Sequence, residues 1–499
     1  MMILTIDIGG TSVRALLFDG RGVQIPGLEA RRPSSLRQTA DGGVEADAEE
    51  FLGTVSECID EALVKVGVES AAKSSVDGSG VESIDGVAFS TFWHSLVGVS
   101  REGRAVTPLY TLGDSRSGPA CERLAKMVDA AAVHQRTGCV VHPSYPPAKL
   151  LWLKETKRDV FDRVAWWCSI GEYIQYRLFG RRLCSISIAS GSGLWNRIRC
   201  EWDAELLETL GISEEQLSTV GDMDSPFVGL SHPYGERWPS LRSVPWYPAL
   251  ADGACSSIGS GCTGPSRAAV MIGTTGAMRI VVPEAPQRIP SGLWCYRVDR
   301  ARAVIGGAIA NGGDLYEWLT RTLRLEMPTD ALDAEILGRG PASHGLTVLP
   351  YLSGERSPGW RSDARAAVLG IDGGTTSMDV LQAAMESVAY CFASIWRLLC
   401  AALPPVAQLV ATGGALQKSR AWNQILADVL GEPITLSRVS EASARGAALL
   451  ALEASGAIGR VEEVDPFLGA TFEPRSDFHG VHAISMNRFE NYYRKLYGG

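Results

Sequence analysis

Two segments of the chain repeat one pattern of apolar and small polar residues. Ile6 to Phe18 and Val270 to Val282 each predict an apolar strand, a turn rich in glycine and threonine, and a second apolar strand. The matching positions keep a constant offset, in the pairs Ile8 and Ile272, Gly9 and Gly273, and Thr11 and Thr275. Either segment alone is as readily an ordinary hairpin. Their repetition predicts two related lobes that close on one nucleotide.

The remaining pattern alternates between strands and helices. Apolar residues at helical spacing predict helices at Val44 to Lys65, Met378 to Leu403, Ala421 to Leu430 and Ala442 to Ala454. Apolar runs predict strands at Ile84 to Ser90, Leu346 to Leu352 and Gln408 to Ala411, and small polar residues predict a loop at Ser70 to Gly80. Such alternation is typical of the α/β class. Turn residues at Gly261 to Ser266 predict a boundary between an N-terminal lobe, residues 1–260, and a C-terminal lobe, residues 261–499.

Composition narrows the class of partner. A chain of 499 residues is expected to form about two to four domains, and its 45% hydrophobic content is enough for sizeable cores. The formal charge of −9, with basic residues spread along the chain, argues against nucleic acid or an anionic membrane surface. No apolar run of membrane-spanning length and no signal-peptide order is seen. The eleven scattered cysteines, without a C-x-x-C pair, predict reduced, packed thiols in a cytoplasmic protein.

Two carboxylates stand where phosphate chemistry would need them. Asp7 comes just before the Gly9 to Thr11 turn, whose backbone N–H groups suit a phosphate, and it either orients water on Mg²⁺ or braces the turn. Asp252 begins a predicted helix before Gly253, so it is either a base for a hydroxyl proton or a helix N-cap. The P-loop, zinc-protease and nucleophile-elbow motifs do not occur.

Longer motifs carry a family resemblance. Ser144-Tyr-Pro-Pro-Ala-Lys-Leu-Leu-Trp-Leu153 resembles the first signature of the FGGY carbohydrate kinases, with Thr156 as its one departure. Ala366-Ala-Val-Leu-Gly-Ile371, followed by Asp379-Val-Leu-Gln-Ala-Ala-Met-Glu386, resembles the second signature throughout. With the two hairpins and Val410-Ala-Thr-Gly-Gly-Ala415, these segments identify the chain as a member of that family, within the superfamily of actin, heat-shock chaperones and sugar kinases. The resemblance implies two ribonuclease-H-like lobes with a nucleotide and sugar cleft between them.

Within the family, the chain is most similar to gluconate kinases. Ser169-Ile-Gly-Glu-Tyr-Ile174 and Ile305-Gly-Gly-Ala-Ile-Ala-Asn-Gly-Gly313 carry this likeness. Phe92-Trp-His-Ser95 stands where these enzymes usually have Gln-Met-His-Ser, and Leu112-Gly-Asp-Ser-Arg116 stands where Trp-Ala-Asp-Thr-Arg is usual. Both departures lie in segments that face the sugar, so a xylulose-type ketose or a polyol stays open beside gluconate as the acceptor.

The resemblance assigns roles to individual residues. It implies that Asp252 is the catalytic base and that Asp7 serves Mg²⁺. It implies ATP-binding roles for residues in the two turns and in the glycine-rich segments, namely Gly10, Thr11, Ser12, Arg14, Gly273, Thr274, Thr275, Gly276, Asn311, Gly313, Gly413, Gly414 and Ser419. It implies an acceptor site formed by Trp93, His94, Asp114, Arg116 and Asp252. Alternation along the strand leaves Arg14 facing either the site or solvent.

Arg116 has two interpretations. Its planar guanidinium is suited to the carboxylate of a sugar acid, and it is equally suited to pairing with Asp114. Three classes of function therefore remain: an ATP- and Mg²⁺-dependent carbohydrate kinase, a silent sugar-binding regulator, and a chaperone- or actin-like ATPase. Asp7 and Asp252 argue against the regulator, and the absence of a peptide-binding domain after the second lobe argues against the ATPase. A homodimer is the usual assembly of such kinases.

Overall fold

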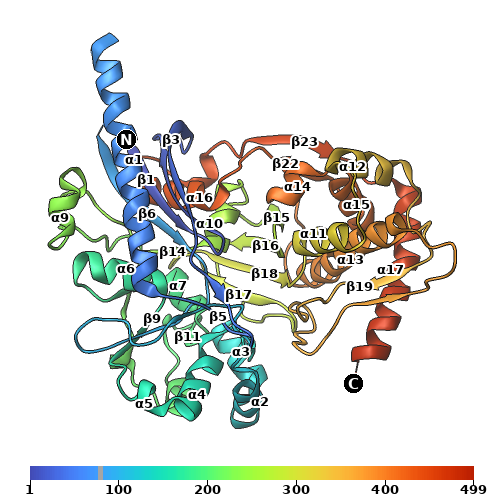
Figure 1. The fold of residues 1–499 in the computed structure, drawn as a ribbon, viewed down its shortest axis with the longest axis horizontal. Helices are drawn as coiled ribbons and strands as arrows, with labels where there is room; N and C mark the ends of the chain where they lie inside the picture. The colour runs from blue at the N-terminus through green and yellow to red at the C-terminus, as the bar shows by residue number, and fades with distance from the viewer. Residues whose placement is uncertain (77–82, 499) are drawn as a thin grey trace.

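The computed structural model describes residues 1–76 and 83–498 and contains two large sheets, one in each half of the chain (Figure 1). The first has five strands in the order β14 (Leu250–Ala251), β6 (Ile84–Thr91), β1 (Met2–Ile8), β2 (Ser12–Phe18) and β3 (Gln24–Pro33). The second has seven in the order β17 (Trp294–Arg297), β18 (Ala303–Ile309), β16 (Gly276–Val282), β15 (Arg267–Ile272), β21 (Gln408–Thr412), β22 (Ile434–Ser437) and β23 (Leu468–Phe472).

The repeated sequence pattern forms the same structure in both sheets. β1 pairs antiparallel with β2 and parallel with β6, and β15 pairs antiparallel with β16 and parallel with β21. Each hairpin turns through the predicted three residues, 9–11 in the first and 273–275 in the second. The prediction of two related α/β lobes is therefore confirmed at the level of strand pairing.

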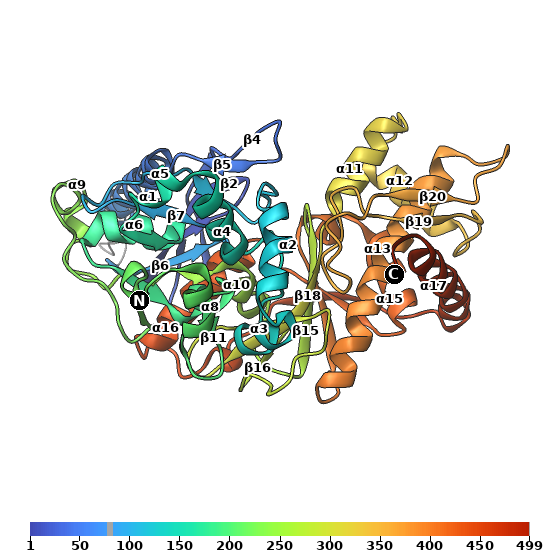
Figure 2. The same cartoon turned by 90° about the horizontal axis from the view of Figure 1, so that it is seen from below.

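Helices surround both large sheets (Figures 1 and 2). In the first half they are α1 (Ala48–Val76), α2 (Gly118–Met127), α3 (Ala130–Thr137), α4 (Pro146–Thr156), α5 (Arg158–Phe161), α6 (Ile170–Phe179), α7 (Ile186–Gly191), α8 (Ala204–Leu210) and α9 (Tyr234–Arg237). In the second half they are α11 (Gly313–Thr322), α12 (Thr329–Gly338), α13 (Ser377–Ala402), α14 (Gly414–Lys418), α15 (Arg420–Leu430) and α17 (Ser476–Tyr497).

Smaller sheets complete the fold. β4 (Arg37–Gln38), β5 (Val44–Ala46) and β8 (Leu109–Tyr110) form one sheet, and the remaining strands pair as β7 (Val97–Val99) with β9 (Trp166–Cys168), β10 (Leu183–Ser185) with β13 (Thr219–Gly221), β11 (Trp195–Asn196) with β12 (Glu201–Trp202), and β19 (Thr347–Leu349) with β20 (Ala367–Leu369). None of the described helices combines the length and apolar character needed to cross a membrane. All eleven cysteines are unpaired and most are buried, as predicted.

Two helices lie between the large sheets and contact both lobes. They are α10 (Asp252–Gly259) and α16 (Ala442–Ala454), and α16 has the predicted bounds. They cross so closely that a Cβ on Gly259 would lie 1.9 Å from the carbonyl oxygen of Ala442, and one on Gly446 would lie 1.9 Å from that of Cys255. α16 also packs on β1 and β6, while α10 contacts β16. The division after residue 260 stays a prediction, because α16 follows it in sequence yet packs on the first sheet.

One predicted helix and its following loop differ from the structure. Residues 44–46 form β5, and α1 begins at Ala48 and continues through Val76, beyond Ser70 where a loop was predicted. Alanine and lysine in residues 70–76 are good helix formers, and neither glycine nor proline occurs among these residues. Residues 77–80 of the predicted loop lie outside the described residues.

We expect Gly446→Ala to destabilise the protein, because the added methyl group must push α10 away from α16. Overpacking of this kind costs about 1–3 kcal/mol, so the melting temperature followed by circular dichroism should fall. Gly53→Ala is the matched control: Gly53 is also helical but has nothing within 4 Å of an added Cβ. That change should stabilise α1 slightly. A Gly446→Ala protein that melts at the wild-type temperature would contradict the close helix contact.

Candidate active site

Asp252 lies where β14 ends and α10 begins. It is the first residue of α10, and Ala251 occupies the N-cap position, so the N-cap interpretation of Asp252 is wrong. Its carboxylate accepts a hydrogen bond from the N–H of Gly253, at 2.7 Å. Burial raises the pKa of Asp252, and the nearby positive charges of Arg279 and Arg356 partly oppose this. A raised pKa makes the carboxylate a better proton acceptor.

Asp7 lies at the end of β1 and is almost fully buried, with 4% of its surface exposed. Arg14 faces it from β2, with Nη1 3.2 Å from an Asp7 carboxylate oxygen and 2.7 Å from one of Glu441. Arg14 therefore points into the site. Burial, with a smaller contribution from the negative charge of Asp252, raises the pKa of Asp7 to about 6, although Arg14 opposes this shift. The two aspartates are thus close enough to interact.

The two turns present their backbones differently. Gly10 and Thr11 are exposed at the first turn and Thr274 is exposed at the second, with Gly273 and Thr275 partly exposed. Ser12 is buried and its hydroxyl accepts a hydrogen bond from Arg14 Nε at 3.0 Å. Gly276 is also buried, and a Cβ there would lie 2.8 Å from the side chains of Ile309 and Phe392. Ser12 and Gly276 therefore support the turns from within.

A cavity of about 430 Å³ opens beside the second turn. Five of the sequence-predicted residues line it, namely Gly273, Thr274, Gly313, Gly414 and Ser419. Tyr316, Lys418 and Trp422 also line it, and sequence reasoning missed them because no motif marks them. An added Cβ on Gly414 would meet nothing within 4 Å, so its backbone is open to a ligand. The cavity combines exposed backbone, aromatic rings and a lysine, which suits a nucleotide.

Three residues predicted to bind the nucleotide make contacts within the protein that explain why these residue types are present. Gly413 has φ 91°, and a Cβ there would lie 2.5 Å from the carbonyl oxygen of Ile272, so glycine is required for packing against β15. Asn311 donates to Asp314 and accepts from the N–H of Ser353. The Ser419 hydroxyl donates to Asp333 and accepts from the N–H of Trp422. These contacts position the cavity wall.

Trp93 and His94 form part of an aromatic wall beside Asp252. The indole of Trp93 packs over Gly253, and its Nε1 donates to the carbonyl of Ser187 at 3.0 Å. Rings of Tyr145 and Tyr296 contact His94 edge to face, at centroid distances of 4.6 and 5.7 Å. This wall suits a sugar, whose C–H faces pack on aromatic rings.

His94 is held neutral in one tautomer. Burial lowers its pKa to about 3, and its Nδ1 lies 2.6 Å from the carbonyl oxygen of Gly191. Since a carbonyl only accepts, Nδ1 carries the proton and Nε2 keeps a lone pair. Its φ of 63° is a left-handed conformation that non-glycine residues seldom adopt. The side chain of His94 therefore presents an acceptor nitrogen, Nε2, at this position.

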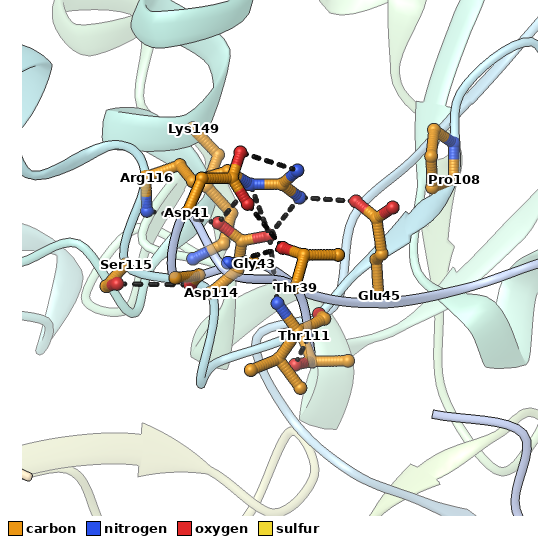
Figure 3. Close-up of polar contacts among 12 residues, drawn as sticks. Thr39, Asp41, Gly43, Glu45, Pro108, Thr111, Asp114, Ser115, Arg116 and Lys149 are labelled. Atoms are coloured by element: carbon orange, nitrogen blue, oxygen red, sulfur yellow. Dashed lines mark hydrogen bonds and ion pairs between the residues drawn. The ribbon is translucent and has the colours of Figure 1, made fainter. Parts of the chain in front are cut away.

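Asp114 and Arg116 form a separate cluster (Figure 3). Arg116 donates to Asp114 and Glu45 and lies 3.8 Å from Asp41, and Asp114 also accepts from the N–H of Val44. Among the described residues, no hydrogen bond or ion pair joins either residue to Trp93, His94 or Asp252. Of the two interpretations of Arg116, pairing with Asp114 is the one observed, because its charge is already matched by carboxylates.

The donor set fits MgATP. Mg²⁺ is usually held by one or two carboxylates, phosphate oxygens and water, and Asp7 supplies a buried carboxylate whose pKa is raised chiefly by burial although Arg14 is nearby. In the described part of the chain, no group of three or more His, Cys, Asp or Glu side chains is arranged to hold a metal. The cavity at Gly414 supplies room for a nucleoside beside the second turn.

Comparisons with known proteins agree with this arrangement. Residues 2–259 match the N-terminal domain of the FGGY family of carbohydrate kinases, and residues 268–455 match its C-terminal domain. A gluconokinase of Bacillus subtilis is 28% identical, over 99% of this chain and 96% of that protein. Structures of a ligand-bound xylulose kinase and a gluconate kinase, both from Lactobacillus acidophilus, have TM-scores of 0.89 and 0.88 at 26% identity, each covering 99% of this chain and 98% of the other.

We expect Arg116→Met to destabilise the protein, because it leaves the 1%-exposed Asp114 side chain without its main cation. Breaking a buried ion pair costs about 3 kcal/mol, so thermal melting should occur several degrees lower. Arg279→Met is the control, since Arg279 is equally buried but has no ion-pair partner within 4 Å among the described residues. Its removal should leave the melting temperature unchanged or raise it. Equal melting temperatures for Arg116→Met and wild type would contradict the structural role.

Proposed function

Because this chain belongs to the FGGY family of carbohydrate kinases, we propose that it transfers the γ-phosphoryl group of ATP to a hydroxyl of gluconate or a related sugar acid. The observation that carries this proposal is the position of Asp252. It lies between Asp7, at the phosphate turn, and the aromatic wall of Trp93 and His94. Phosphoryl transfer to a hydroxyl needs in-line positioning, charge neutralisation and one base, and this position is suited to the base.

The chain's own residues orient the acceptor in this mechanism. The indole of Trp93 packs against the sugar's C–H face, and Nε2 of His94 accepts a hydrogen bond from a hydroxyl. Asp252 accepts the proton of the reacting hydroxyl as the hydroxyl oxygen attacks the γ-phosphorus of ATP and displaces ADP. The lobes close over the reactants to exclude water, which limits idle hydrolysis of ATP.

ATP would occupy the cavity beside Gly273 and Gly414, with its phosphates against the two turns. Mg²⁺ would supply charge neutralisation at the phosphates, and Asp7 would hold it through water or directly. Arg14 keeps Asp7 in place, because it is fixed between Asp7 and Glu441. We also propose that the enzyme acts in the cytoplasm, with its thiols reduced, and that it forms a homodimer, as related kinases do.

A neutral ketose or polyol is the alternative acceptor. What favours it is the apolar character of Trp93 at the wall, since an indole whose Nε1 is already bonded offers no group that selects an acid. A silent regulator is disfavoured, because Asp7 and Asp252 are both present and electrostatically coupled.

The acceptor can be identified by measuring ADP release from the purified protein with MgATP. We expect gluconate, or another aldonate, to stimulate release more than xylulose, ribulose, glycerol or erythritol do. Stimulation by a neutral compound alone would replace the sugar acid with a ketose or polyol. No stimulation by any compound, despite demonstrable ATP binding, would favour the regulator.

We expect Asp252→Asn to bind both ATP and acceptor yet turn over at least about 100-fold more slowly, because a general base contributes about 10²–10⁴-fold. Binding is measured by calorimetry and turnover with the preferred acceptor of the panel. Asp224→Asn is the matched control, because Asp224 is an exposed aspartate whose ion-pair partner is Arg300. If Asp252→Asn retains near-normal turnover, Asp252 is not the base.

A further inference from the structure

Two guanidinium groups at the aromatic wall have no anionic partner. Arg279 has 9% of its surface exposed, and Arg356 is partly exposed. In each, Nε is buried and has no hydrogen-bond partner, and neither guanidinium forms an ion pair within 4 Å among the described residues. About half of the arginines form an ion pair with a carboxylate in the described part of the chain, as Arg116 does with Asp114 and Glu45. A buried cation without a partner is costly for folding, so a functional reason is expected.

Strand pairing places Arg279 on the wall. Arg279 on β16 and Trp294 on β17 both lie opposite Gly306 of β18, so they point to the same face of the second sheet. Tyr296 shares that face because it lies two residues after Trp294. A Cβ on Gly253 would lie 2.5 Å from Trp93 and 3.3 Å from the guanidinium carbon of Arg279. Arg279 is therefore next to both the proposed base and the proposed sugar wall.

Arg356 reaches the same region from another segment. The following residue, Ser357, is anchored to β18 by two hydrogen bonds with Ala308, of 2.8 and 3.1 Å. The Arg356 guanidinium lies 5.8 Å from the ring centroid of Trp360, which packs against Tyr145. Its positive charge lowers the pKa of both His94 and Arg279, so it is close to both.

We propose that Arg279 and Arg356 together bind the carboxylate of the acceptor, and that they make the enzyme selective for a sugar acid. This rests on the proposed function, in which Asp252 deprotonates a hydroxyl of the same molecule. Guanidinium groups form strong, charge-assisted hydrogen bonds to carboxylates, and the aromatic wall between them strengthens these by excluding water. Asp252 interacts with both through space but lies beyond ion-pair distance, so their N–H groups remain available to a ligand.

The carboxylate of the acceptor fits this pair better than a phosphate of ATP does. Arg279 is three residues beyond Gly276 on β16, which puts its backbone about 10 Å from the end of the phosphate turn. Arg356 packs on Trp360 at the aromatic wall, and neither arginine lines the nucleotide cavity. Both arginines therefore lie on the acceptor side of the site and not on its nucleotide side.

The test compares two ligands that differ only at this group. D-Gluconate and D-glucitol share their hydroxyl pattern, but glucitol has a hydroxymethyl group in place of the carboxylate. Their affinities are measured by calorimetry on the full-length protein without nucleotide, for wild type, Arg279→Met and Arg356→Met. Arg237→Met is the control, because Arg237 is a half-exposed arginine on α9 that pairs with Asp60.

We expect wild type to bind gluconate at least about tenfold more tightly than glucitol, since one charge-assisted hydrogen bond is enough for such a difference. Arg279→Met and Arg356→Met should each lower the affinity for gluconate at least about tenfold and change the affinity for glucitol less than about threefold. Arg237→Met should change neither. Undetectable gluconate binding by wild type, or unchanged gluconate affinity in both variants, would overturn the proposal.

Steady-state kinetics separate this proposal from the proposed function. If the arginines serve ATP instead, both variants should raise the KM for ATP or lower kcat equally with every acceptor, and the carboxylate proposal would be wrong. If no acceptor is phosphorylated although the variants lose gluconate binding selectively, the kinase proposal fails and the carboxylate site stands. If only neutral acceptors are phosphorylated and gluconate does not bind, the kinase class stands and the carboxylate site fails.

Discussion

The glycine-lined contact between α10 and α16 is the constraint on which the rest of the site depends. Gly259 and Gly446 allow the two helix backbones to touch, and no side chain separates them. α10 begins with Asp252, and α16 follows directly after Glu441. Because Glu441 holds Arg14 and Arg14 holds Asp7, one helix contact sets the relative position of both carboxylates. A small change in this crossing would therefore reach the phosphate and acceptor sides together.

The charges of the site are divided between its two sides. On the phosphate side, Asp7 and Asp252 raise each other's cost of ionisation, and Arg14 is shared with Glu441. On the acceptor side, Arg279 and Arg356 are cations without carboxylate partners within 4 Å in the described part of the chain. The charges on the phosphate side are balanced only when a cation binds, and those on the acceptor side only when an anion binds. Such a division lowers the stability of the ligand-free protein but favours a ligand pair of complementary charge.

The sequence predicted the elements that depend on local pattern. The turns of the two hairpins and the bounds of α13, α15 and α16 were predicted to within about one residue, whereas β1 and β15 begin at Met2 and Arg267, before the predicted starts at Ile6 and Val270. β19 is shorter than predicted, and α1 is longer, because residues 70–76 allow either a loop or a helix and the chain favours the helix. The sequence also does not separate the roles of neighbouring glycines. Gly413 and Gly414 are adjacent and alike in the sequence, yet Gly413 is required for packing on Ile272, whereas the backbone of Gly414 is open to a ligand.

Side-chain pairing was beyond the reach of the sequence. Arg116 lies two residues after Asp114, but Glu45 and Asp41, which complete its cluster, come from a distant hairpin. Arg279 lies inside the apolar hairpin segment of residues 270–282 and carries no signal in the sequence, because its significance is the lack of an ion-pair partner. Only the folded chain shows which arginines are matched by carboxylates and which are not.

The unusual Trp93 explains why selectivity would depend on charge. Its ring fits because glycine lies on both sides: a Cβ on Gly191 would come within 2.3 Å of it, and one on Gly253 within 2.5 Å. Its Nε1 is bonded to the chain, so only an apolar face is left for a ligand. Apolar contact distinguishes sugars of similar shape poorly, whereas an unmatched charged group discriminates strongly. With Trp93 limited to packing, His94 can select a hydroxyl, and the guanidinium pair is the part of the wall able to separate an acid from a neutral sugar.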